Sequence, residues 1–96
     1  MCELNREKYT MAMSENLQML RARLGLTQQE LCKLIGVSRQ SIVQAERSHK
    51  LAWNTYLALV FLFSKSEETK RLMTFLNIYP QEFDGLFAAG KEQLQS

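Results

Sequence analysis

The 96-residue sequence predicts an all-α protein, a compact bundle of five or six short helices. Two observations lead to this fold class. The chain contains only one proline and four glycines, so few positions interrupt a helix. Apolar residues recur every three or four positions in several segments, and no segment shows the alternation of a half-buried strand. A chain of this length is expected to form one domain with a modest core.

The first predicted helix begins at Ser14, whose hydroxyl can cap a helix N-terminus. Residues 1–13 have no clear helical period, so we expect them to form a flexible N-terminal arm. The apolar positions that follow Ser14 at helical spacing are Leu17, Leu20 and Leu24. Gly25 is then expected to end the helix.

The second predicted helix begins at Thr27, in the segment "TQQE". This pattern is typical of a capping box, in which the Thr27 hydroxyl and the Glu30 carboxylate each bind a backbone amide of the other residue. The predicted apolar stripe of this helix consists of Leu31, Leu34 and Ile35, with Cys32 beside it. Gly36 is expected to end the helix with a positive φ, a conformation that costs glycine least.

The third predicted helix spans about residues 38–47, with Ser38 as its N-cap. Ile42 and Ala45 are its expected inward positions. The residues expected to point outward are Arg39, Gln40, Val43 and Gln44. Two helices joined by a tight turn at a glycine are typical of a helix-turn-helix, whose second helix enters the DNA major groove.

A fourth helix is predicted over about 53–63, apolar almost all round and therefore buried on several sides. Ser66 is expected to cap a fifth helix, and Pro80 to begin a sixth. The expected inward residues of these last two helices are Leu72, Met73, Leu76, Phe83, Leu86 and Phe87. We therefore expect residues 14–63 to form the DNA-binding domain, and residues 64–96 to form a helical extension on the same core.

The formal net charge is +2, but the positive charge is concentrated in one segment. Residues 21–50 hold six lysines and arginines against two glutamates, and this excess favours a polyanionic partner.

With one histidine and no phosphate-cradling glycine loop, no enzyme activity, cofactor or metal is expected. The apolar stretch 51–63 is shorter than the roughly 20 residues that span a bilayer. The two cysteines are far apart, and together these features favour a cytoplasmic protein with no membrane partner.

The segment "LRARLGLTQQELCKLIGVSRQSIVQAERS" resembles the lambda-repressor-like, or Xre/Cro, helix-turn-helix DNA-binding domains. "LGLTQQELC" is similar to the first two helices of that family, and "GVSRQSI" to its turn and the start of its recognition helix. The family commonly has glycine where Ser48 stands and proline near Ala52, so the loop after the third helix is expected to differ.

The resemblance implies roles for individual residues. Arg39, Gln40 and Gln44 take the base-reading positions, and Val43 can contact a thymine methyl group. Arg21 and Glu46 take the positions of a structural ion pair that joins the first and third helices. The residues expected to contact phosphate are Gln28, Ser38, Ser41, Arg47 and Lys50, the last two through the loop after the third helix.

The resulting prediction is a sequence-specific transcriptional regulator, a repressor that binds double-stranded DNA as a homodimer. The apolar residues of the C-terminal helices offer surface for the dimer contact. An alternative prediction is a protein-interaction module, such as an antitoxin that binds a toxin partner and represses its own gene.

Overall fold

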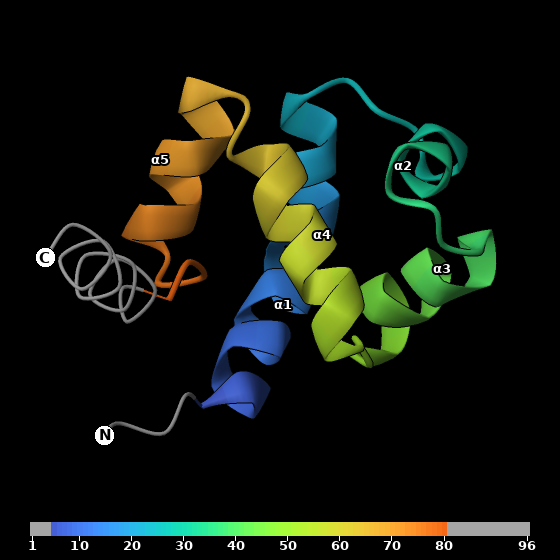
Figure 1. Ribbon diagram of the computed structural model, residues 1–96, viewed down its shortest axis with the longest axis horizontal. Helices are drawn as coiled ribbons and strands as arrows, with labels where there is room; N and C mark the ends of the chain where they lie inside the picture. The colour runs from blue at the N-terminus through green and yellow to red at the C-terminus, as the bar shows by residue number, and fades with distance from the viewer. Residues whose placement is uncertain (1–4, 81–96) are drawn as a thin grey trace, which may run out of the picture.

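The computed structural model describes residues 5–80, which form five helices and no strand (Figure 1). The helices are α1 (Arg6–Arg23), α2 (Gln28–Ile35), α3 (Arg39–Ser48), α4 (Trp53–Phe63) and α5 (Glu67–Phe75). α1 contacts α3, α4 and α5, while α2 contacts α3 and α4. In Figure 1, α2 and α3 lie at one end of the bundle and α5 lies at the other. The predicted all-α fold is confirmed for this part of the chain.

The core draws fully buried side chains from all five helices. The largest of them are Met13, Leu17, Leu20, Leu31, Ile42, Tyr56, Leu59, Phe63 and Met73. The Tyr56 hydroxyl donates a hydrogen bond of 2.5 Å to the carbonyl oxygen of Ile78, beyond the end of α5. The Thr69 hydroxyl of α5 donates one of 2.5 Å to the carbonyl of Phe63, the last residue of α4. These two buried bonds fix α5 and the segment after it to α4.

The expected start of the first helix at Ser14 is wrong. α1 begins at Arg6, and the side chain of Asn5 caps it by accepting a hydrogen bond of 3.1 Å from the Lys8 amide. Ser14 lies inside α1, where it is 2% exposed and its hydroxyl donates to the carbonyl of Met11 at 2.9 Å. Residues 6–13 are therefore helical and not a flexible arm, and they lengthen α1 by about two turns. Residues 1–4 lie outside the described part.

Some apolar residues of the predicted helices lie at the surface. Leu34 of α2 is 60% exposed, and Leu57 and Phe61 of α4 are 38% and 65% exposed. Tyr56, Leu59 and Phe63 of α4 are nevertheless fully buried, so the predicted burial of this helix is confirmed for part of its surface only. A helix that is apolar all round gives no sequence signal for which side finds a partner.

The C-terminal part of the prediction is only partly within the described residues. α5 begins after Ser66 as expected, although the Ser66 side chain makes no capping hydrogen bond. Met73 is fully buried, whereas Leu72 and Leu76 are half-buried. The predicted sixth helix after Pro80, with Phe83, Leu86 and Phe87, lies outside the described residues. Among residues 5–80, no helix is long and apolar enough to cross a bilayer.

Candidate nucleic-acid interface

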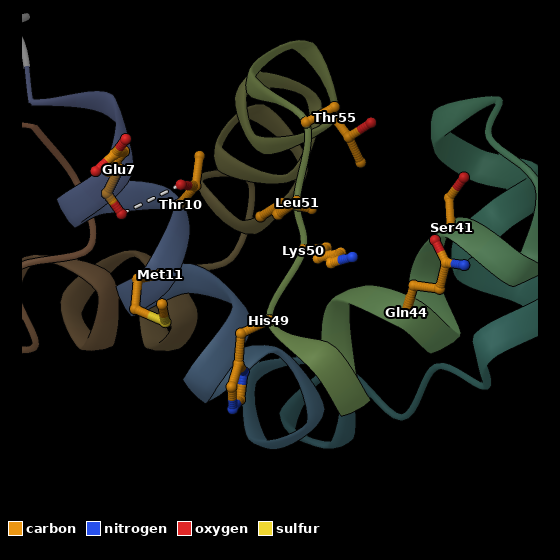
Figure 2. A pocket seen from close by; sticks show the side chains of 10 residues that line it. Glu7, Thr10, Met11, Ser41, Gln44, His49, Lys50, Leu51 and Thr55 are labelled. Atoms are coloured by element: carbon orange, nitrogen blue, oxygen red, sulfur yellow. Dashed lines mark hydrogen bonds between the residues drawn. The ribbon is translucent and has the colours of Figure 1, made fainter.

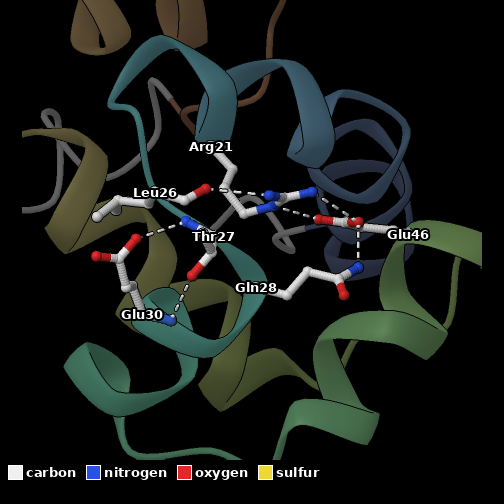
Figure 3. A network of polar contacts seen from close by, with 6 residues as sticks. All are labelled: Arg21, Leu26, Thr27, Gln28, Glu30 and Glu46. Carbon is white, nitrogen blue, oxygen red and sulfur yellow. Dashed lines mark hydrogen bonds and ion pairs between the residues drawn. The ribbon is translucent and has the colours of Figure 1, made fainter.

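The N-terminus of α2 is closed by the predicted capping box (Figure 3). The Glu30 amide donates to the Thr27 hydroxyl at 3.1 Å, and the Thr27 amide donates to the Glu30 carboxylate at 2.9 Å. The bond from the Thr27 amide, followed by the bond to its side chain, lowers the pKa of Glu30. Because the pKa is lowered in the folded state, this stabilising contribution is present at neutral pH and is lost as the pH falls through the folded pKa.

The turn between α2 and α3 is made at Gly36, as predicted. Gly36 has φ +73°, and the amides of Gly36 and Val37 both donate to the carbonyl of Cys32, at 2.9 and 3.2 Å. Apart from the adjoining residues of the chain, no atom stands within 4 Å of the position that a Cβ would take at Gly36. The requirement for glycine is therefore set by the backbone conformation and not by lack of space.

Replacing Gly36 with alanine should lower the free energy of unfolding by about 1–2 kcal/mol, the cost of a left-handed conformation for an L-residue. Gly36→Asn is the matched control, because asparagine tolerates this conformation better and should lose less. Chemical denaturation of the three proteins measures the difference. Equal stabilities for the alanine and wild-type proteins would contradict the assigned turn.

α3 begins at Arg39, with Ser38 as its N-cap, and presents two different sides. The Ser41 amide donates to the Ser38 hydroxyl at 3.2 Å, and the Ser38 and Ser41 hydroxyls are hydrogen-bonded to each other at 2.9 Å. Ile42 and Ala45 are fully buried, as predicted. The residues on the outer side are Arg39, Gln40 and Gln44, which are exposed, and Val43, which is half-buried. This outer side is available to a partner along most of the helix.

A partly buried polar network joins α1, α2 and α3, and Figure 3 shows its members. Arg21 donates to the Glu46 carboxylate through Nε at 2.9 Å and Nη2 at 3.3 Å, and its Nη1 donates to the Leu26 carbonyl at 3.0 Å. The side chains of Arg21 and Glu46 are 15% and 8% exposed. The predicted ion pair between these residues is therefore present, and it fixes α3 to the end of α1.

Gln28 completes this network, because its Nε2 donates to Glu46 Oε1 at 2.9 Å. Its side chain is thus turned toward α3, although we predicted from the family resemblance that it contacts phosphate. Gln28 also lines a concavity at the start of α2, together with Thr27, Gln29 and Arg39. The network therefore fixes the position of the N-terminus of α2 relative to Arg39, the first residue of α3.

The loop after α3 begins at His49, which has φ +58° and is the C-cap of the helix. The left-handed position therefore falls on His49 and not on Ser48, which is the last residue of α3. His49 Nδ1 lies 3.5 Å from the Ser14 hydroxyl of α1. Because that hydroxyl donates to Met11, we assign the proton in this contact to His49 Nδ1. Arg47 and Lys50, the predicted phosphate contacts, are both exposed.

A concavity of about 590 Å³ runs beside α3 (Figure 2). Ser41 and Gln44 of α3 stand on one side of it, and Glu7 and Thr10 of α1 stand on the other. Lys50 projects from the loop between them. Sequence reasoning missed the α1 side, because the residues before Ser14 were not expected to be helical. Within residues 5–80 no cluster of side chains could hold a metal ion.

This geometry is matched by a comparison with known families. Residues 17–51 match the family model described as Helix-turn-helix, which confirms the resemblance to lambda-repressor-like domains. The match runs from the second half of α1 into the loop before α4, and this segment is similar to the DNA-binding helix-turn-helix of transcription regulators. No characterised protein and no solved structure matches the chain.

Proposed function

We propose that the protein is a sequence-specific transcriptional repressor that inserts α3 into the major groove of its operator. The observation that carries this proposal is the exposed polar side of α3, held outward by two buried residues and by the Arg21–Glu46 pair. Arg39 is suited to bind guanine O6 and N7, and Gln40 and Gln44 are suited to bind adenine N6 and N7. Val43 is suited to contact a thymine methyl group.

Phosphate contacts are proposed for the residues around this reading surface. Arg47 and Lys50 are exposed cations at the end of α3, and Ser38 and Ser41 have hydroxyls at its start. Gln28 keeps one amide hydrogen for a phosphate while the other is bound to Glu46. Such contacts fix the position of the protein on the duplex but carry no sequence information. We also propose a cytoplasmic location, because the proposed partner is the DNA of a prokaryote or phage.

We further propose that the repressor is a homodimer, since one recognition helix reads few base pairs. Two half-sites would then lie about 34 Å apart, one turn of the duplex. Phe61 and Phe75 are 65% and 82% exposed, which supports the existence of a protein contact on α4 or α5. Sedimentation of the purified chain tests this. A chain that stays monomeric and becomes well behaved only with a co-expressed protein would favour the antitoxin alternative instead.

Selection of bound duplexes from random DNA by the purified full chain tests the function directly. We expect enrichment of one sequence with two-fold symmetry, and an affinity that falls steeply with salt, with a slope near −0.9 per phosphate contacted. Enrichment of a single half-site without symmetry would contradict the dimer. No enrichment at all would contradict the proposed function.

A further inference from the structure

The first three turns of α1 precede the helix-turn-helix match, which starts at residue 17, yet they contact the loop that follows α3. Ser14 contacts His49 at the end of α3. Arg6 lies at the other end of the loop between α3 and α4. Its guanidinium carbon is 5.3 Å from the ring centroid of Trp53, the first residue of α4. The early turns of α1 therefore flank the loop between α3 and α4 on both of its ends.

The concavity in Figure 2 is continuous with the proposed reading surface. Gln44, a proposed base reader, forms one side, and Glu7 and Thr10 of α1 form the other. Lys50 supplies a positive charge between them. A DNA strand that is bound by α3 and continues along this concavity would pass Lys50 and then reach the first turn of α1.

We propose that the first turn of α1 makes a second contact with the sugar–phosphate backbone, outside the bases read by α3, with Arg6 as its cation. This inference rests on the proposed function. The Arg6 guanidinium carbon lies 5.3 Å from the Trp53 ring centroid, and a cation–π contact of this kind leaves the guanidinium N–H donors able to bind a phosphate. Arg6 is exposed, so a phosphate can reach it.

Glu7 allows a second test of the proposal, in which the substitution should raise the affinity for DNA and not lower it. Its carboxylate lines the same concavity, where it repels a nearby phosphate. In the first turn of α1 a negative charge also stabilises the helix, which accounts for an acidic residue at this position. Removing the Glu7 charge should therefore tighten DNA binding, although it removes a favourable helix contact. A gain in affinity cannot result from partial unfolding.

The experiment measures the affinity of the full chain for the duplex that the wild-type protein selects, extended by flanking base pairs on both sides. The variants are Arg6→Gln and Glu7→Gln. The matched controls are Arg71→Gln and Glu67→Gln, which change the same charges on α5, at the end of the bundle away from α2 and α3 (Figure 1). Fluorescence anisotropy at several salt concentrations gives each dissociation constant and its salt slope.

For each protomer bound, we expect Arg6→Gln to weaken binding by roughly threefold to tenfold and to reduce the salt slope by about 0.9, the value for one lost phosphate contact. Glu7→Gln should tighten binding by about twofold to fivefold at low salt, and the α5 controls should change it by less than about twofold. If Arg6→Gln also lowers the melting temperature, its weaker binding could come from a loss of folding. The Glu7→Gln result then decides whether the first turn of α1 contacts the DNA backbone.

Two outcomes overturn different statements. If wild-type protein binds the selected duplex, but the α1 variants behave like their α5 controls, the second contact is wrong and the proposed function stands. If wild-type protein selects no duplex, the proposed function itself is wrong.

Discussion

Replacing Glu46 with alanine should lower the free energy of unfolding by about 3–5 kcal/mol, the typical cost of removing one partner of a buried ion pair. The Glu46 side chain is 8% exposed, and its carboxylate accepts hydrogen bonds from Arg21 and Gln28. The substitution leaves the Arg21 guanidinium with the Leu26 carbonyl as its remaining partner among these contacts. Urea denaturation of the two proteins measures the loss.

The double variant Arg21→Met with Glu46→Leu is the control for this prediction. Replacing a whole buried ion pair by apolar side chains is often neutral or stabilising, so the double variant should be much more stable than Glu46→Ala. It should nevertheless bind the selected duplex more weakly than wild type, because the ion pair orients α3 relative to α1. A Glu46→Ala protein as stable as wild type would show that the network contributes nothing to the fold.

Replacing Arg39 with alanine should weaken binding to the selected duplex by about 5-fold to 150-fold for each half-site, the range of one good bidentate base contact. Arg39 is the first residue of α3 and is exposed, so the fold should be unaffected. Binding to a duplex of unrelated sequence should change far less, since that binding depends on phosphate contacts. Competition between the two duplexes measures both quantities.

Arg39→Lys is the control that separates charge from geometry. Lysine keeps the positive charge but not the planar pair of donors, so it should retain non-specific binding and lose part of the specificity. Equal losses on both duplexes for Arg39→Ala would show that Arg39 is not a base reader.

The sequence predicted α2, the turn and α3 because their signals are local. Thr27, Gly36 and Ser38 each specify a helix end through their own backbone and side-chain chemistry, and all three have the predicted roles. The start of α1 could not be read in this way. Ser14 looks like a cap, but its hydroxyl bonds to Met11 inside the helix, whereas Asn5 makes the cap.

Side-chain directions were harder to predict than helix ends. Gln28 lies at the position expected from the family, yet its amide turns to Glu46, a residue 18 positions later. The α1 side of the concavity was missed for the same reason, since only packing brings Glu7 and Gln44 to one groove. The outward positions of Arg39, Gln40 and Gln44 are confirmed, while their base contacts stay predictions.

The position of Cys32 makes local opening of α2 measurable. Cys32 is 6% exposed on the inner side of this helix, and burial raises the pKa of its thiol. Alkylating reagents attack the thiolate, so labelling must wait for a fluctuation that detaches α2 from the bundle. In a chain with Cys2 replaced by serine, the rate of alkylation at Cys32 measures how often these fluctuations occur. If a bound DNA duplex slows the alkylation of Cys32, the size of the effect measures how strongly DNA binding suppresses the opening of α2.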